Sequence, residues 1–379
     1  MIRLTRPWLG PEEEGAVADV LRSGMLVQGA RVADFERAVS AVTGRQHAVA
    51  VTNGTTALML ALEALGIGPG ARVLVPNLTW PSPAHAVLDL GATPVLVDVD
   101  MREWNAGPDE MAGALITHGP IAAAIAIDQF GNPARAVEIA SALERANGGK
   151  PLPLIVDAAC SLGSSYQGAP CGSSGVIACT SFHPRKVITT GEGGMCLTDD
   201  DALVERLREL RNHGQGAPGG TVTPGKFTRA SGNHRMSEVS AALGLEQMKR
   251  LDAIVKARRE LTQHYQPALE AVGLVLQQEP PGGVTNRQTL GVLLPEPCTA
   301  AERDAFIVAL AAHGVQAGAL SYALNTLPHL ATLPSAQAAL FSCSESIVRR
   351  GLALPLYPGM TRADQDAVIA AVSAALKTR

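Results

Sequence analysis

The sequence has little lysine, few aromatic residues and no excess of charge of either sign. Lysine and arginine together number 31 against 35 acidic residues, which leaves a formal net charge of −4 at pH 7. This balance supplies neither the broad basic field typical of nucleic-acid binding nor a polybasic patch for an anionic membrane. We therefore expect no nucleic-acid and no membrane partner. A small molecule or a second copy of the chain is the expected partner instead.

Two further absences narrow the class of protein. No run reaches the roughly 20 uncharged residues of a membrane span, and the N-terminal segment lacks the apolar core of a signal peptide. The six cysteines include no C-x-x-C pair, which argues against a zinc site or a disulfide framework and fits a reducing compartment. We expect a cytoplasmic protein without a metal site.

Short apolar runs alternate with helix-length segments through the first two thirds of the chain. The runs are nearly free of polar residues, as is typical of strands that are covered on both faces of a parallel or mixed sheet. The alternation predicts a doubly wound α/β domain. The predicted strands are 47–51, 72–76, 93–99, 120–127, 151–157, 176–182 and 194–199, and the predicted helices are 54–66, 80–90, 108–117 and 133–146.

The last third of the chain shows a different order of predicted elements. A long Gly, Pro and Thr loop at 212–232 is followed by a helical stretch from about 236 to 270, a β run near 284–294, a helix near 300–313 and a closing helix after Thr361. Loops of this length inside compact domains are usually functional. With 379 residues, 46% of them apolar, the chain is long enough for one large and one smaller domain. We predict a large α/β domain at 1–245, with segment 1–10 packing on the other domain, and a small α+β domain at 246–379.

The scarcity of lysine makes Lys186 conspicuous. Only six lysines occur, and the other five lie on charged helical stretches or in loops, where solvated surface is the plain interpretation. Lys186 follows an apolar strand, at the end where open α/β sheets bind ligands, and small and Gly-rich residues come after it. We expect its amine to be partly desolvated, with a lowered pKa that makes it a Schiff-base nucleophile. The alternative is that Lys186 merely ends a strand.

A carboxylate lies at a second strand end. Asp157 closes the apolar run PLPLIVD, and the spacing to Lys186 is enough for one crossover and one further strand. The two side chains can therefore converge on one crevice, although a lone Asp here is equally often a helix N-cap. Together they suit pyridoxal phosphate, because the amine can form an aldimine and the carboxylate can keep the pyridine nitrogen protonated.

Three further stretches add weaker signals. At Asn53-Gly54-Thr55-Thr56 a strand gives way to a helix whose free N–H groups and dipole can bind a phosphate, and Ser181 is placed to reach the same group. Trp80 follows a strand and can either stack on a cofactor ring or pack in the core. The polar run 233–235 precedes an apolar helix and can face a site or a neighbouring subunit.

Taken together, these stretches resemble the DegT/DnrJ/EryC1/StrS family of pyridoxal-phosphate-dependent sugar aminotransferases, which have fold type I. The resemblance runs through nearly the whole chain, and the ordered series is specific although each piece alone is not. The pieces are PWLGPEEEGAVADVLRSGMLVQGARVADFERAVS, NGTTAL, PNLTWPSPAHAV, DAAC, SFHPRK, GEGGM, GNHRMSE and GLALPLYPGM.

The resemblance implies a role for each matching position. Lys186 resembles the lysine of the internal aldimine and the base that moves the proton, Asp157 the partner of the pyridine nitrogen, and Trp80 the aromatic that stacks on the ring. The phosphate-binding positions are matched by Gly54, Thr55 and Ser181.

One matching position implies a homodimer, and three further positions concern the cofactor oxygen and the substrate. Asn233 matches an asparagine that reaches the phosphate from the partner subunit, which implies a homodimer with composite active sites. Cys160 stands where the family often has Gln or His beside the phenolic oxygen of the cofactor, so this hydrogen bond is in doubt. His183 is expected to line the substrate entrance, and Tyr322 lies in a region expected to govern specificity.

The implied reaction is ping-pong transamination from glutamate or glutamine to a keto sugar. A nucleotide-linked 4-keto-6-deoxy sugar is the first choice by family analogy, and a keto-cyclitol or a 3-keto sugar is the alternative. Sugar dehydratase relatives carry His in place of the lysine, so Lys186 argues against that chemistry. A non-catalytic regulator of the same fold is a further alternative, which the intact lysine, carboxylate and phosphate positions disfavour.

Overall fold

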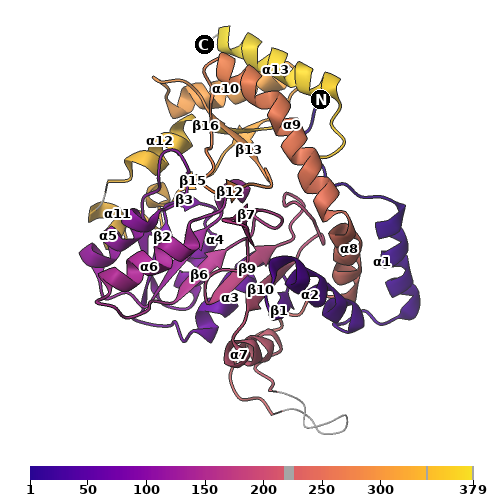
Figure 1. Cartoon of the computed structure of the whole chain (residues 1–379), viewed down its shortest axis with the longest axis vertical. Coiled ribbons are helices and arrows are strands. Elements are labelled where there is room, and N and C mark those ends of the chain that lie inside the picture. The colour runs from indigo at the N-terminus through magenta and orange to yellow at the C-terminus, as the bar shows by residue number, and fades with distance from the viewer. Residues whose placement is uncertain (217–225, 339, 378–379) are drawn as a thin grey trace.

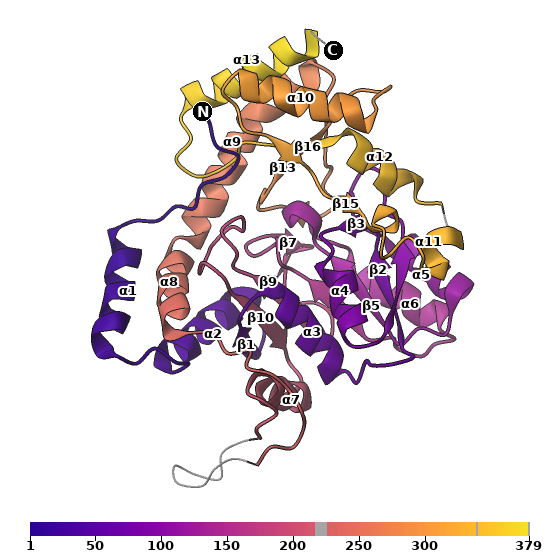
Figure 2. The same cartoon turned by 180° about the vertical axis from the view of Figure 1, so that it is seen from behind.

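The computed structural model describes residues 1–216, 226–338 and 340–377. A large mixed sheet occupies the first two thirds of the chain, and a smaller sheet lies in the last third. The long helix α9 (Leu251–Ala271) runs from the neighbourhood of the large sheet toward the smaller one (Figures 1 and 2). Of the loop expected at 212–232, residues 217–225 lie outside the described residues.

The large sheet has seven strands in the order β1-β10-β9-β6-β5-β2-β4. Strands β9, β6, β5, β2 and β4 are parallel, whereas β10 runs antiparallel to both β9 and β1. All seven were predicted, with ends that differ by up to three residues. Their bounds are β1 His47–Val51, β2 Arg72–Pro76, β4 Thr93–Val97, β5 Ala123–Ile127, β6 Leu154–Asp157, β9 Ile177–Ser181 and β10 Gly194–Thr198.

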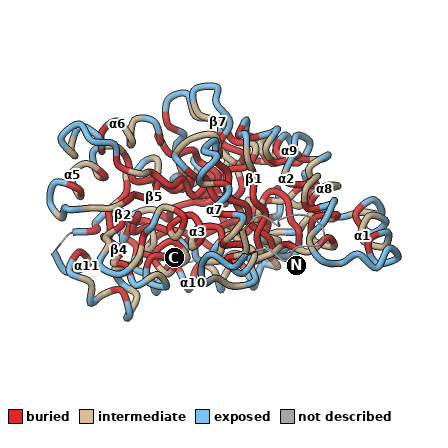
Figure 3. Tube along the Cα trace, turned by 90° about the horizontal axis from the view of Figure 1, so that it is seen from below, coloured by how far each residue is buried: buried red, intermediate tan, exposed pale blue. Residues whose placement is uncertain are grey.

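Helices cover both faces of this sheet, which explains why its strands are apolar at nearly every position. Alternate side chains of each strand enter two separate cores. Ile155 belongs to the core that includes residues of α3, α4 and α7, while Val156 belongs to the core that includes residues of α2, α5 and α6. The buried residues accordingly concentrate along the sheet in Figure 3. The helices are α2 Ala30–Thr43, α3 Gly54–Ala64, α4 Ser82–Asp89, α5 Pro108–His118, α6 Ala136–Ala146 and α7 Asp201–Arg211.

The smaller sheet has the order β11-β13-β16-β14 and is fully antiparallel. It shares a core with α9, α10 and α13. Segment 1–10 joins it by backbone hydrogen bonds, from Ile2 to Gly314 at 2.7 Å and from Leu356 to Leu4 at 3.2 Å. The bounds here are β11 Val275–Leu276, β13 Leu290–Leu293, β14 Gly318–Ala319, β16 Gly351–Leu354, α10 Ala300–Ala312 and α13 Arg362–Lys377.

The other elements belong to neither of these two sheets. The remaining strands are β3 Leu78–Thr79, β7 Ser165–Tyr166, β8 Ala169–Pro170, β12 Gly283–Val284 and β15 Tyr322–Ala323. The remaining helices are α1 Pro11–Ser23, α8 Glu238–Lys249, α11 Pro334–Ala338 and α12 Ser342–Arg350, with 3-10 turns at Gln129–Gly131 and Leu324–Thr326. The proposed boundary after residue 245 falls inside α8, and the division into two domains stays a prediction.

Two expectations about the last third need correction. The helical stretch from 236 to 270 is two helices, α8 and α9, that meet at Arg250. The β run at 284–294 is interrupted between β12 and β13, because Arg287 has a φ of 55° and the chain turns there instead of extending.

The carboxyl ends of β5 and β6 bring two buried acids together. Asp128 follows β5, and its N–H donates to the carbonyl of Asp157, the last residue of β6. The Asp128 carboxylate accepts the Ser161 hydroxyl at 2.5 Å and the Ala134 N–H at 2.8 Å. Burial raises the pKa of Asp128 to about 6, although the hydrogen bonds from Ser161 and Ala134 oppose the rise. Asp128 thus ties together the loops that follow both strands.

We expect Asp128→Asn to change how stability depends on pH. Between the ordinary pKa of 3.8 and the folded value of about 6, the folded chain binds more protons than the unfolded chain, so the free energy of unfolding falls as pH rises. The variant keeps an acceptor for the Ala134 N–H and removes this loss. Between pH 4 and pH 7 its free energy of unfolding should therefore rise, relative to that of the wild type, by up to about 3 kcal/mol. Urea unfolding from pH 4 to 7 measures this, with the exposed Asp109→Asn as control. An identical pH slope in wild type and Asp128→Asn would refute it.

Candidate active site

Lys186 lies in a turn that follows β9. Its N–H donates to the carbonyl of His183 at 2.8 Å, which closes the turn, and its side chain is half-buried. The Nζ atom lies 3.1 Å from the Sγ of Cys160, which comes from the loop after β6. Parallel β6 and β9 are neighbours in the sheet, so their carboxyl ends deliver these two side chains to one place.

The expected direction of the Lys186 pKa was wrong. Burial alone lowers the pKa of this amine, as the sequence suggested. The Cys160 sulfur, which both interacts electrostatically and accepts a hydrogen bond, raises it, and so does the carboxylate of Asp157. These two neighbours outweigh burial and the repulsion from Arg185, and the net pKa is raised. The amine is therefore held as an ammonium group by its neighbours.

Asp157 is buried, with 7% of its surface exposed. Its Oδ1 accepts the Ala159 N–H at 3.0 Å, while Oδ2 accepts no hydrogen bond within the described part of the chain. Burial raises the pKa of this carboxyl, and the Lys186 charge and the Ala159 N–H oppose the rise. A buried carboxylate with one oxygen to spare is suited to a cationic or N–H partner.

Gly54, Ser181 and the start of α3 form a close cluster. Asn53 caps the helix by accepting the Thr56 N–H at 2.8 Å, which leaves the N–H groups of Gly54 and Thr55 directed at the space before the helix. A Cβ on Gly54 would lie 2.9 Å from the Ser181 Cβ, so only glycine permits this approach. The cluster has the donors and the dipole of an anion site.

Thr55 connects this cluster to the aromatic side chains. Its hydroxyl lies 2.9 Å from that of Ser82, at the start of α4. Two residues earlier, Trp80 is 60% exposed and packs edge to face against Tyr322, with ring centroids 5.4 Å apart. The contact follows from the pairing of β3 with β15, which places Tyr322 opposite Thr79. Trp80 is therefore not a core residue, and more than half of its surface is exposed.

The other two predicted residues lie at the edges of this region. The Nδ1 of His183 accepts the Arg185 N–H at 3.2 Å, and burial lowers the pKa of the ring, opposed by Glu192. Asn233 is exposed, and its side chain accepts only the N–H of Arg235, at 3.3 Å, among the residues described. The next residue, His234, hydrogen-bonds through its carbonyl to Thr52, close to the start of α3. Asn233 thus faces outward near the anion cluster.

Sequence reasoning missed several polar residues here. Asp128 ends a strand as Asp157 does, so the same rule about strand ends would have found it. His85 of α4 and His329 lie with their Nε2 atoms 2.8 Å apart, and they are brought together only by the fold. Ser82 likewise carried no signal of its own.

The side chains present fit pyridoxal phosphate. The cluster of Gly54 and Ser181 offers an anion site, and a Cβ at Gly54 would prevent these two residues from lying so close together. Asp157 offers a buried carboxylate, and Lys186 offers an amine. Trp80, which is largely exposed, offers an aromatic ring next to Ser82 and the start of α4. Over the described ranges, no group of three or more His, Cys, Asp or Glu side chains is arranged to hold a metal ion. Nor does any helix there have the length and apolar character needed to cross a membrane.

Known proteins share both sequence and fold with this chain. GDP-perosamine synthase from Caulobacter vibrioides is 36% identical, over 99% of this chain and 98% of its own. The solved aminotransferase TlmJ from Streptoalloteichus hindustanus is 30% identical with a TM-score of 0.90, covering 100% of this chain and 99% of its own. The PLP form of the putative sugar aminotransferase Spr1654 from Streptococcus pneumoniae, 23% identical, superposes with a TM-score of 0.91 over 98% of both chains.

These comparisons confirm the α/β fold of type I, the identification as an enzyme and the cofactor, pyridoxal 5'-phosphate. The model of the DegT/DnrJ/EryC1/StrS aminotransferase family matches residues 7–373. With a match of this length, the chain belongs to the DegT/DnrJ/EryC1/StrS aminotransferase family.

Proposed function

We propose that this enzyme moves an amino group from glutamate or glutamine to a keto sugar linked to a nucleotide, with a 4-keto-6-deoxy sugar as the first choice. The observation that carries the proposal is the convergence of the Lys186 amine with the buried Asp157 carboxylate at one edge of the sheet. The relative named GDP-perosamine synthase favours a nucleotide-linked acceptor. The cysteine pattern, which fits a reducing compartment, favours the cytoplasm as the place of the reaction.

Each side chain of the site has a proposed task. Lys186 would hold the cofactor through its amine and, once released by the incoming donor, would carry the proton between substrate and cofactor carbons. Asp157 would hold a proton on the pyridine nitrogen, and its Oδ2, which accepts no hydrogen bond from the residues described, supports this task. Gly54, Thr55 and Ser181 bind the phosphate. When bound, the cofactor stores the amino group between the two halves of a ping-pong reaction.

The raised pKa of Lys186 has a consequence for this scheme. An ammonium group has no lone pair to offer a carbonyl carbon, so the amine would have to lose its proton before it could hold the cofactor. The Cys160 sulfur, 3.1 Å from Nζ, and the Asp157 carboxylate both favour the protonated amine and therefore oppose this loss. We propose that Cys160 takes the place of the Gln or His expected beside the phenolic oxygen, with its sulfur directed at the lysine.

The outward-facing Asn233 supports a composite site. We propose that it binds the cofactor phosphate of the partner in a homodimer, because it is exposed near the anion cluster and makes only a local hydrogen bond within the described chain. Two-fold pairing places the same residue of each subunit at the site of the other.

The acceptor is proposed to enter beside Trp80. Tyr322 packs on this ring, and the segment that follows carries His329 to the pair with His85. His183 belongs to the same turn as Lys186, three residues before it, and is proposed to line the entrance. A keto-cyclitol or a 3-keto sugar stays the alternative acceptor.

A panel of nucleotide-linked keto sugars tests the acceptor class. The enzyme carrying the amino group on its cofactor is mixed with each compound, and the return of the cofactor absorbance to the unloaded form is followed. We expect discharge by 4-keto-6-deoxy sugars linked to a nucleotide and none by the free sugars. Discharge by keto-cyclitols alone would replace the first choice with the alternative.

We expect Lys186→Ala to abolish turnover, by at least about a thousandfold, because no other group can replace the amine. Borohydride treatment of the wild type with pyridoxal phosphate should fix the cofactor on the Lys186 peptide, and the variant should retain none after unfolding. The exposed Lys249→Ala serves as control and should match the wild type. Sustained turnover by Lys186→Ala would contradict the assigned role.

We expect Asn233→Ala to weaken cofactor retention by about tenfold, as the loss of one hydrogen bond to a charged group predicts. The decisive measurement is co-expression with Lys186→Ala. Hybrid dimers then contain one site with both defects and one intact site. At a cofactor concentration that fills the wild type but not Asn233→Ala, the mixture should therefore recover about a quarter of the wild-type activity. A mixture no more active than Asn233→Ala alone under these conditions, with hybrid dimers formed, would rule out a site shared in this way.

A further inference from the structure

Residues 285–288, here called the crossing segment, lie across the carboxyl ends of three strands of the large sheet. The segment joins β12 to β13 and so belongs to the last third of the chain. It first reaches the turn after β5, where the Thr285 hydroxyl donates to the carbonyl of Gly131 at 2.9 Å. Further along the segment, the side chains of Asn286 and Gln288 hydrogen-bond to the loops that carry Cys160 and Lys186.

Asn286 is completely buried and uses its whole amide. Its Nδ2 donates to the carbonyls of Cys160 and Leu162, at 2.8 and 2.9 Å, and its Oδ1 accepts the Gln288 N–H at 2.9 Å. A Cβ at Gly131 would lie 2.0 Å from this Oδ1, so the amide fits only against glycine. The backbone of Cys160 is therefore fixed from outside its own loop.

Gln288 does the same for the turn that carries the lysine. Its Nε2 donates to the carbonyl of Arg185 at 2.6 Å, one residue before Lys186. Its Oε1 accepts the Thr289 hydroxyl at 2.8 Å, which fixes the orientation of the amide. Both loops thus receive a side-chain hydrogen bond from the same short segment.

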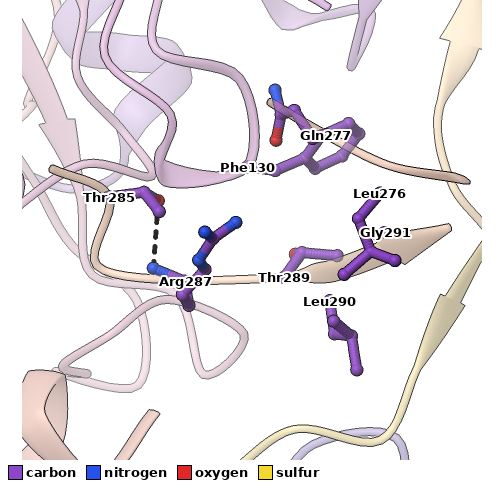
Figure 4. Close-up of a pocket in the computed structure, with 8 residues that line it drawn as sticks. All are labelled: Phe130, Leu276, Gln277, Thr285, Arg287, Thr289, Leu290 and Gly291. Carbon is purple, nitrogen blue, oxygen red and sulfur yellow. Dashed lines mark hydrogen bonds between the residues drawn. The ribbon is translucent and has the colours of Figure 1, made fainter. Parts of the chain in front are cut away.

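The backbone between these residues is strained and held. Arg287 has a φ of 55°, which is unfavourable for a non-glycine residue, and its N–H donates to the Thr285 hydroxyl beside a small cavity of about 10 Å³ (Figure 4). From α9, the buried Arg258 donates through Nη1 to the carbonyls of Arg287, at 3.3 Å, and Gln288, at 2.9 Å. Such strain persists only where the surroundings fix it, often beside functional sites.

We propose that Asn286 and Gln288 are positioning residues that together hold the Cys160 thiol against the Lys186 amine. The inference rests on the proposed role of Lys186, whose reactivity this contact sets. Asn286 fixes the carbonyl of Cys160 itself, and Gln288 fixes the carbonyl that precedes Lys186. The distance of 3.1 Å between Sγ and Nζ therefore depends on a segment more than a hundred residues away in sequence.

Gln288→Leu tests this directly. The variant leaves the Arg185 carbonyl without its amide donor, so the turn can move and the amine can leave the thiol. Charged and titratable groups around Lys186 are Cys160, Asp157, Arg185 and His183. With the thiol withdrawn, burial lowers the pKa of the amine, and more of it is unprotonated near neutral pH.

The measurement is competitive acetylation of the full chain, freed of cofactor, with trace acetic anhydride between about pH 7 and 11. Peptide mass spectrometry reads the labelling of Lys186 against that of the exposed Lys249. We expect the midpoint for Lys186 to fall in Gln288→Leu, with about threefold or more labelling at pH 8. Gln288→Met, whose chain is similar in length, serves if the first variant does not fold.

Gln365→Leu is the matched control. Gln365 is also buried and donates Nε2 to the Leu261 carbonyl at 2.8 Å, within the smaller sheet's core region. It should lose a similar amount of thermal stability without moving the Lys186 midpoint, which separates positioning from general destabilisation. In a Cys160→Ala background, where the thiol is already absent, Gln288→Leu should add no further shift.

An unchanged midpoint in Gln288→Leu, or a shift that adds to that of Cys160→Ala, would overturn the inference. Because the labelling needs no cofactor, its failure is separate from failure of the proposed function. That function would instead fail if the wild type captured no pyridoxal phosphate on Lys186, whatever the labelling showed.

Discussion

The interaction on which the site depends is the electrostatic grouping of Lys186, Cys160 and Asp157 at the carboxyl edge of the large sheet. Burying a lone ammonium or a lone carboxylate is costly, and each of these groups offsets part of the cost for the other. The grouping raises the pKa of the lysine above its ordinary value in spite of burial. The amine would therefore have to lose a proton, against the effect of these neighbours, before it could react with a carbonyl carbon.

The rest of the architecture positions these three groups. Parallel strands β5, β6 and β9 end at one edge, the start of α3 supplies an anion site beside them, and the pair of Trp80 and Tyr322 adds an aromatic face. The last third of the chain contributes through hydrogen bonds to backbone carbonyls, with Asn286 and Gln288 as its contacts. The two sheets are thus joined where the chemistry is proposed to occur.

Much of the large sheet could be predicted because burial on both faces makes its strands continuously apolar, a signal visible in sequence. The helices α1, α2 and α7 were not predicted, because they precede the first strand or follow the last and so lie outside the alternation. The interruption at 285–289 could not be predicted either. A β-like composition is overridden there by the left-handed backbone of Arg287, which tertiary hydrogen bonds stabilise.

The sequence by itself determined which residues end the strands: Lys186 in a glycine-rich turn and Asp157 after an apolar run both follow from local pattern and the geometry of parallel sheets. Only the tertiary structure decided which groups face the amine. The contact with Cys160 helps to reverse the expected direction of the Lys186 pKa shift. Electrostatic effects depend on distances of a few ångströms, which spacing in sequence does not specify. The roles of Asn286 and Gln288 depend equally on long-range packing, and no local pattern marks them.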